Sequence, residues 1–306
     1  MKKLFKYTIL LLVILFVVEL YLRFYWGFCD SVLMQYSSRY EYIEQPNQNR
    51  FRFRKHIRYN SFSMRSDEVD STALTILGFG DSIFNGGVQV DQDSIASSIL
   101  SKDLSKELGY KTQVLNVSAG SWGPDNCFAY LKEKGDFNSK LIFLVVSSHD
   151  AYDVMDFMPV IDKVDRYESK QYRSAIWELI SRYAIPRVMK NFPSDVVGIA
   201  NKSNKFNPGF ADFANYCQQN RKPFFIYLNP DTTEVNAGKY KPEGEKIKDF
   251  CKSNQIECIE GLGHTQLEDY RGVIHLNESG QRKMAELIKN AIIHRKENLP
   301  TKNKVR

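Results

Sequence analysis

The sequence predicts an α/β fold in which helices cover both faces of a doubly wound parallel sheet. One N-terminal transmembrane helix precedes these three layers. The first observation behind this prediction is that short apolar segments alternate with segments of helical spacing between residues 73 and 295. Buried parallel strands are short apolar runs, and their alternation with amphipathic helices is typical of α/β folds. The second observation is that residues 7–18 are all uncharged and nearly all large and apolar.

The composition is that of a globular protein. The chain has 306 residues, of which 43% are hydrophobic and 25% charged. These values exclude wholesale disorder and a protein with many membrane spans. The net charge of +6 comes from the two ends of the chain. Because the rest is nearly neutral, we expect no nucleic-acid partner. We divide the chain into an anchor at 1–28, a juxtamembrane segment at 29–72, an α/β domain at 73–295 and a basic tail at 296–306.

The N-terminal segment is long enough to cross a bilayer. Counted to Phe28, the apolar run is about 33 Å long at about 1.5 Å per residue. Glu19 and Arg23 interrupt it, but they stand four residues apart and can pair. Basic residues precede the run, so the body is expected on the periplasmic side of the inner membrane. A cleaved signal peptide is the alternative, although no small-residue cleavage site follows the run.

Five strands and four helices are expected in the α/β domain. The third strand is wholly apolar, which favours the centre of the sheet. Pro124 stands where the first turn of a helix accepts proline. The expected strands are 73–79, 113–117, 141–146, 223–228 and 256–259, and the expected helices are 93–108, 124–133, 242–253 and 278–293.

Two stretches do not follow this alternation: residues 30–70, a polar, aromatic and irregular link between the membrane and the first strand, and residues 156–205. Residues 156–205 contain a helical pattern at 174–190 that Pro186 interrupts. This insertion is either a lid over the strand ends or an ordinary crossover with one extra helix. Residues 50–58 alternate basic and apolar side chains, which predicts an edge strand. Its basic face either contacts phospholipid or an anionic glycan, or lies in water while its Phe side chains pack on the body.

Chemically informative residues lie in four loops, of which three follow an expected strand and one precedes the last expected helix. Ser82 comes directly after the first strand in Gly80-Asp81-Ser82-Ile83. Gly120 follows the second strand, and Ser147-Ser148-His149-Asp150 follows the third. His275-Leu276-Asn277 stands immediately before the last helix. Ligands of α/β folds bind at the carboxyl ends of the strands, so these loops are expected to form one site.

These four motifs, in this order, resemble those of the SGNH or GDSL hydrolase family over about residues 73–295. The resemblance implies that Ser82 is the nucleophile and His275 its general base. It also implies that the N–H groups of Ser82 and Gly120 bind the oxyanion. The chain is similar to membrane-anchored members whose relatives are bacterial polysaccharide O-acyl esterases and acyltransferases.

The first departure from the family pattern is Gly272, which stands where the family has the Asp that orients the histidine. Such a carboxylate stabilises the imidazolium during acyl transfer. Three outcomes are open. A backbone carbonyl near Gly272 could accept the Nδ1–H of His275, or Asp269 or Glu268 could replace the missing carboxylate. The third outcome is a weak or inactive site.

The second departure is His149, which replaces the family's Asn. An imidazole N–H can also donate to an oxyanion, so an oxyanion-hole role is expected. A packed histidine bonded to Asp150 or Asp153 is the alternative. No metal site is expected, because His149, Asp150, Asp153 and Asp156 would have to converge from one loop.

The function expected from these residues is that of a membrane-anchored serine esterase. It would remove O-acyl groups, foremost O-acetyl groups, from cell-envelope carbohydrate through an acyl-Ser82. One alternative is a polysaccharide O-acyltransferase that uses the same acyl-serine, and another is an inactive binding protein of envelope assembly. The expected partners are an acylated carbohydrate or other ester and, through the anchor, membrane lipid. No cofactor is expected.

Overall fold

The computed structural model describes residues 1–164, 166–188 and 203–295, and it contains the predicted parallel sheet. All neighbouring strands of this five-stranded sheet are parallel, and their order is β6-β5-β7-β8-β9. The central strand is β7, as predicted, and all of its residues are buried. The strands are β5 (Leu74–Gly80), β6 (Thr112–Ser118), β7 (Leu141–Ser147), β8 (Phe224–Asn229) and β9 (Glu257–Glu260).

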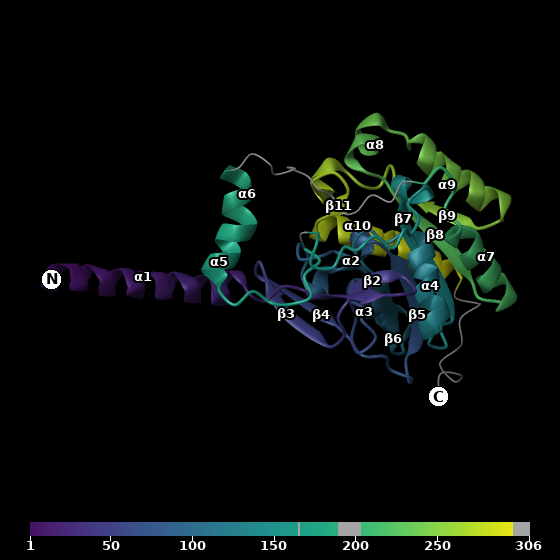
Figure 1. Ribbon diagram of the computed structural model, residues 1–306. Coiled ribbons are helices and arrows are strands. Elements are labelled where there is room, and N and C mark those ends of the chain that lie inside the picture. Colours follow the sequence, from purple (N-terminus) through teal and green to yellow (C-terminus); the bar gives the residue numbers. More distant parts are fainter. Residues whose placement is uncertain (165, 189–202, 296–306) are drawn as a thin grey trace.

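Helices cover both faces of the sheet, which confirms the three-layer architecture (Figure 1). On one face, α3 (Ala96–Leu108) and α10 (Glu278–His294) pack over Leu74 and Ile76 of β5. The other face carries α4 (Pro124–Lys134), α7 (Gly209–Gln219) and α9 (Pro242–Ser253). The helix expected from residue 93 begins at Ala96, because a 3-10 turn occupies Gln92–Ser94. Two short helices, α2 (Ser82–Asn85) and α8 (Thr232–Ala237), complete this part.

Residues 29–72 are not an irregular linker, because they form two antiparallel hairpins that pack on the α/β domain. The first hairpin pairs β1 (Met34–Ser37) with β2 (Glu41–Glu44), and the second pairs β3 (Gln48–Arg52) with β4 (Lys55–Tyr59). Side chains of the first hairpin join the same buried cluster as the helices on one face of the sheet. This segment therefore belongs structurally to the body.

The prediction of one edge strand over residues 50–58 is wrong. Phe53 and Arg54 both have positive φ angles, of 48° and 63°, and they reverse the chain between β3 and β4. The predicted basic face is also divided, since Arg52 is buried and pairs with Glu178. A period-2 pattern in sequence cannot show such a reversal when the turn residues continue the alternation.

The N-terminal helix α1 (Lys2–Trp26) is long and apolar enough to cross a membrane, and no residue of its most apolar window is buried. Arg23 pairs with Glu19 as predicted, with 2.7 Å between Nε and Oε1. A second helical segment comprises α5 (Ala175–Leu179), a π-helical turn (Ile180–Ala184) and α6 (Ile185–Val188). The predicted helix at 174–190 is thus present over 175–188. Residues 189–202 of the insertion and the tail at 296–306 lie outside the described residues.

Candidate active site

Ser82 lies at the carboxyl end of β5 as the first residue of α2. The Asp81 carboxylate caps this short helix by accepting the Ile83 N–H at 2.8 Å. Gly80 allows the chain to turn here, because a Cβ at this position would come within 2.8 Å of the Phe84 Cβ. The Ser82 hydroxyl and N–H are therefore presented together at the edge of the sheet.

His275 approaches Ser82 from a separate hairpin. It begins β11 (His275–Leu276), which pairs with β10 (Tyr270–Arg271) directly before α10. Its Nε2 lies 2.9 Å from the Ser82 Oγ, although the two residues are 193 positions apart. Gln281 helps to hold this geometry, because its Nε2 donates to the Ile83 carbonyl at 2.7 Å and so joins α10 to α2. Nothing in the sequence distinguished Gln281 from an ordinary helix residue.

The environment of His275 favours its neutral form. Burial, with smaller contributions from the charges of Arg166 and His149, lowers the pKa of His275 to about 4. An imidazole that is neutral at pH 7 can accept a proton from the Ser82 hydroxyl. The same low pKa makes it a weaker base than one supported by a carboxylate.

Neither carboxylate expected to orient His275 makes a hydrogen bond to its ring within the described residues. Asp269 is buried and accepts from the Gln266 N–H at 2.8 Å, the Ser279 hydroxyl at 2.7 Å and the Lys283 ammonium at 2.7 Å. Burial raises the pKa of Asp269, but Lys283 and these hydrogen bonds outweigh it and hold that pKa below its usual range. The side chain of Glu268 is exposed.

The carbonyl of Gly272 is not hydrogen-bonded to His275 either, in the part of the chain that the structure describes. Gly272 lies in the turn between β10 and β11 with a φ of +79°. The described groups therefore form a Ser82–His275 pair without a third member.

The two backbone N–H groups expected to bind the oxyanion are not engaged in hydrogen bonds with any residue that the structure describes. Among the described residues, no acceptor takes a hydrogen bond from the N–H of Ser82 or of Gly120. The loop of Gly120 is held by two tyrosines, because its carbonyl accepts from the Tyr42 hydroxyl at 3.0 Å and the Tyr167 hydroxyl at 3.1 Å. Both tyrosines lie outside the family-like motifs, and the sequence carried no signal for their role.

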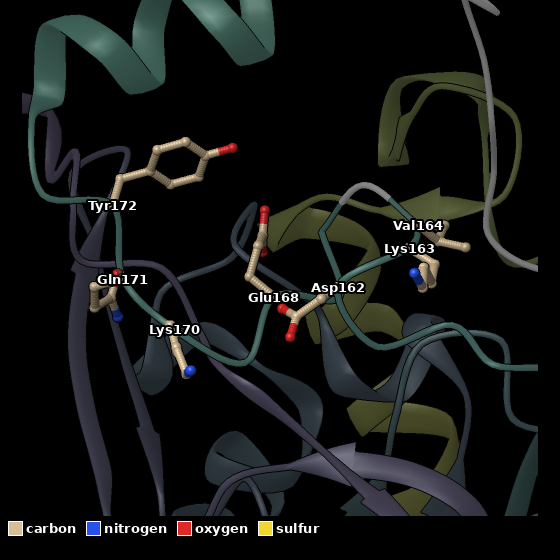
Figure 2. A pocket seen from close by; sticks show the side chains of 7 residues that line it. All are labelled: Asp162, Lys163, Val164, Glu168, Lys170, Gln171 and Tyr172. Carbon is tan, nitrogen blue, oxygen red and sulfur yellow. The ribbon is translucent and has the colours of Figure 1, made fainter.

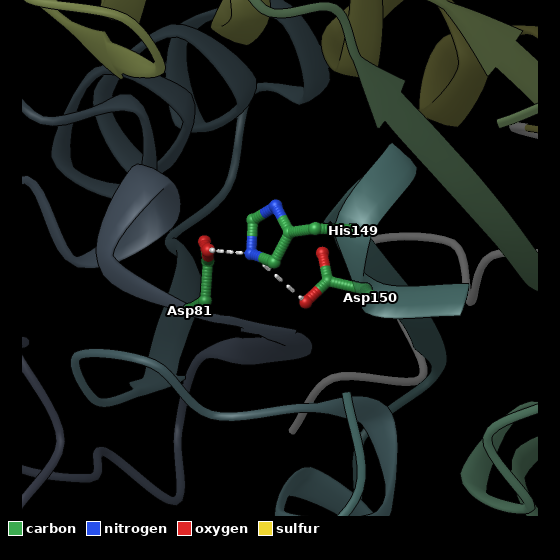
Figure 3. Close-up of side chains that lie close together, drawn as sticks. All are labelled: Asp81, His149 and Asp150. Atoms are coloured by element: carbon green, nitrogen blue, oxygen red, sulfur yellow. Dashed lines mark ion pairs between the residues drawn. The ribbon is translucent and has the colours of Figure 1, made fainter. Parts of the chain in front are cut away.

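The His149 ring lies between the carboxylates of Asp81 and Asp150 (Figure 3). Its Nδ1 lies 2.6 Å from the Ser147 Oγ. Its Nε2 lies 3.7 Å from Asp81 Oδ2 and 3.5 Å from Asp150 Oδ1. Asp150 is one of the neighbours that the packed alternative expected, and Asp81 is a second, although 41% of the His149 side chain stays exposed. Donation to an oxyanion stays a prediction.

The donor atoms of Asp81, His149 and Asp150 all lie within 4.8 Å of one another, which is a possible arrangement for a metal ion. Burial, and then the charge of Asp150, raises the pKa of Asp81 to about 7, and burial raises the pKa of Asp150 to about 7. One nitrogen and two carboxylate oxygens fit a divalent cation such as zinc. A protonated imidazole would compensate the same two oxygens, so the cluster alone does not indicate a metal.

A hollow of about 360 Å³ lies beside the crossover that follows β7 (Figure 2). Neither Ser82 nor His275 lines it. The same loop carries Tyr167, which holds Gly120, and Arg166, whose charge acts on His275. Its lining is mostly charged and polar: Asp162, Lys163, Val164, Glu168, Lys170, Gln171 and Tyr172.

No known protein-family model matches the sequence. No curated protein matches it either. Among solved structures, the chain is similar to TesA, with 15% identity, a TM-score of 0.41, and coverage of 71% of this chain and 97% of that one. A second is a member of the lipolytic protein G-D-S-L family from Veillonella parvula, with 12% identity, a TM-score of 0.39, and coverage of 72% and 99%.

A third similar structure is a two-domain esterase (CEX) active on acetylated mannans, with 12% identity and a TM-score of 0.44. The matched region covers 75% of this chain and 52% of that protein. The second and third are a lipolytic protein and an esterase by name. At TM-scores below 0.5, these similarities do not assign the family.

Proposed function

We propose that this chain is a serine ester hydrolase of the SGNH type, with Ser82 as nucleophile and His275 as general base. The single observation that carries the proposal is the 2.9 Å contact between His275 Nε2 and Ser82 Oγ at the carboxyl edge of the sheet. A nucleophile within hydrogen-bond reach of a neutral base is the minimal arrangement for acyl transfer.

The reaction has two half-steps. Ser82 Oγ attacks the ester carbonyl carbon while its proton passes to His275 Nε2. The N–H groups of Ser82 and Gly120 donate to the oxyanion that forms. Collapse breaks the bond to the alcohol oxygen, which takes the proton from His275, and leaves an acyl-Ser82. Water then attacks the acyl carbon and gives a proton to His275. The bond between the acyl carbon and Ser82 Oγ breaks, Oγ takes this proton back from His275, and the carboxylic acid is released.

Because no carboxylate contacts His275 among the described residues, we expect a low kcat. Loss of the triad carboxylate in a serine protease costs about 10⁴-fold in kcat. A Ser–His pair lacks the charge that stabilises the imidazolium, and this pair also lies near the positive charge of Arg166. We therefore expect a slow enzyme whose acyl-serine forms at a measurable rate.

The proposed location and substrate come from the anchor and the resemblance. The helix α1 would hold the domain at the periplasmic face of the inner membrane. There the enzyme would act on O-acyl esters, foremost O-acetyl groups, of cell-envelope carbohydrate.

Transfer of the acyl group to a sugar hydroxyl is the second candidate function. The observation that favours it is that the loop that lines the hollow also carries Tyr167, whose hydroxyl donates to the Gly120 carbonyl, because an acceptor bound to this loop could compete with water. Such an enzyme would form the same acyl-Ser82. An inactive binding protein is the third candidate, and the intact Ser82–His275 contact disfavours it.

The test uses the full chain in detergent, treated with a small fluorophosphonate and weighed intact by mass spectrometry. We expect one adduct on the wild type, none on Ser82→Ala and slow labelling of His275→Ala. Ser71→Ala removes an exposed serine and should label like the wild type. A folded wild type that stays unlabelled from pH 5 to 9 would overturn both enzyme functions. Release of acetate from acetylated carbohydrate, with and without an unacetylated acceptor, then separates hydrolysis from transfer.

A further inference from the structure

The segment of α5, the π turn and α6, residues 175–188, has its charged side toward the protein and its apolar side outward. Glu178 is fully buried, and its carboxylate accepts the Cys29 N–H at 2.6 Å and pairs with Arg52. One turn on, Arg182 is also buried and pairs with Glu168 at 2.6 Å. A helix on the surface of a protein in water shows the opposite arrangement.

The outward side is a continuous apolar stripe. The exposed fractions are 57% for Trp177, 39% for Ile180 and 81% for Val188, and Ala184 between them is exposed. These positions recur every three or four residues, so they share one face, opposite Glu178 and Arg182. Leaving such a stripe in water is unfavourable, at about 25 cal/mol per Å² of apolar surface.

This helical segment is attached directly to α1. The Glu19 carboxylate of α1 accepts the N–H groups of Ala175 at 2.8 Å and Ile176 at 2.9 Å, and the Ser174 hydroxyl at 3.0 Å. Leu22 and Phe28 form a small buried cluster with Ala175. Glu19 thereby caps the start of α5 and fixes its level along α1. Figure 1 shows α5 and α6 crossing the direction of α1 instead of running along it.

The position of Glu19 along α1 determines at which depth of the bilayer residues 175–188 lie. From the basic residues Lys2 and Lys6 to Glu19, the rise along α1 is about 20–25 Å at about 1.5 Å per residue. A bilayer has a hydrocarbon core about 30 Å thick and is about 40–45 Å thick with its headgroups. If α1 spans the bilayer, a helix fixed at Glu19 cannot clear the outer headgroups.

The neighbouring aromatic residues agree with this depth. Tyr21, Tyr25 and Trp26 of α1 are exposed, and they follow Glu19 by about half a turn to two turns. Trp177 of α5 directly follows Ala175 and Ile176, whose N–H groups Glu19 accepts. Tyr and Trp side chains are enriched where a protein crosses the membrane–water interface.

We propose that residues 175–188 form an interfacial helix that lies in the outer leaflet, with Trp177, Ile180, Ala184 and Val188 among the lipids. This inference rests on the proposed anchoring by α1. The helix would fix the orientation of the body on the bilayer, which one spanning helix alone leaves free to rotate. The loop that leads into α5 carries Tyr167, so the same contact would set the distance of the Gly120 loop from the headgroups.

The experiment measures membrane depth in the full chain reconstituted into phosphatidylcholine vesicles. The partly exposed Cys29 and Cys258 are replaced by Ser, and a nitroxide is attached at Ala184→Cys. Ser253→Cys, an exposed position at the end of α9, is the matched control. Collision rates are measured with oxygen, which concentrates in lipid, and with a water-soluble nickel chelate.

We expect oxygen collisions to exceed nickel collisions several-fold at position 184 and the reverse at position 253. The double variant Ile180→Glu/Val188→Glu should equalise the two rates at 184. Its thermal unfolding should not change, because both side chains are exposed.

Two results would overturn the proposal. Nickel collisions that dominate at 184 would place the helix in water, and magnetic coupling between two labels at 184 would show that a second copy covers the stripe. Flotation of the double variant with the vesicles tests α1 separately, because its interfacial helix is impaired and a chain without a spanning helix would not float with them. Fluorophosphonate labelling of the same vesicles reports on the proposed enzyme independently of the helix depth.

Discussion

The two histidines at the edge of the sheet have opposite surroundings. His275 contacts a nucleophile but no carboxylate among the described residues. His149 lies within 4 Å of two buried carboxylates and contacts no nucleophile other than the hydroxyl of Ser147, which lies two residues before it. The difference shows that acids near a site need not contact its proposed base. A carboxylate supports only the imidazole that it orients, and here the two acids lie beside His149.

Replacing each histidine tests this comparison most strongly. General acid–base catalysis contributes about 10²–10⁴-fold, so His275→Ala should reduce kcat/KM by that much. His149→Asn restores the residue found in the family and should change kcat/KM less than about tenfold, because its ring faces Asp81 and Asp150. Steady-state hydrolysis of a p-nitrophenyl ester measures both. A loss of more than a hundredfold in His149→Asn would show that His149 turns to act on the oxyanion.

The missing carboxylate can be supplied. Gly272→Asp introduces an acid where the family has one, and a Cβ there meets no atom within 4 Å. We expect kcat/KM to rise about tenfold, a fraction of the effect of a native triad carboxylate. The positive φ of Gly272 should cost about 1 kcal/mol of stability. Gly272→Asn carries the same backbone strain without charge and is the control; an equal gain in both variants would contradict the electrostatic explanation.

The pH profile tests the surroundings of His275 more finely. His275 acts as a base only when neutral, and its pKa is lowered to about 4. Activity should therefore be level from about pH 5 to 7 and fall as the pH drops through 4. In Gly272→Asp, the added charge should raise this pKa and move the fall to higher pH. A wild-type profile that already declines below about pH 6.5 would show that the pKa of His275 is not lowered.

The smallest expected effect concerns stability at the His149 cluster. The pKa values of Asp81 and Asp150 are raised from 3.8 to about 7, so the folded state binds protons that the unfolded state releases. The stability that these protons contribute is present at low pH and is lost as the pH rises from about 4 to 7. Asp150→Asn should therefore stabilise the protein by about 1–2 kcal/mol at pH 8 and by less at pH 5.

Thermal unfolding at the two pH values measures this difference, with the exposed Asp249→Asn as the matched control. If Asp150→Asn destabilises the protein at pH 8, the carboxylates are compensated there by a bound cation or by an imidazolium.

Much of the fold followed from local patterns. The apolar runs of the sheet strands and the uncharged run of α1 predicted the α/β class and its five strands. The loops of Ser82 and His275 were predicted to meet because the carboxyl ends of parallel strands share one edge. The hairpins of residues 29–72, α7 and α8 were not predicted. Their turns and short amphipathic stretches resemble ordinary loop composition.

The sequence by itself determined which residues are buried in the sheet and which loops gather at its edge, because periodicity and the succession of strands along the chain can be read from the sequence. Only the tertiary structure decided the partners of the polar groups. It directs Asp269 to Lys283 instead of His275, brings Tyr42 to the carbonyl of Gly120, and turns Glu178 inward against Arg52. Each of these contacts joins side chains whose separation depends on how whole elements pack. A hydrogen bond fails when that separation changes by an ångström, and no local pattern encodes a separation so finely.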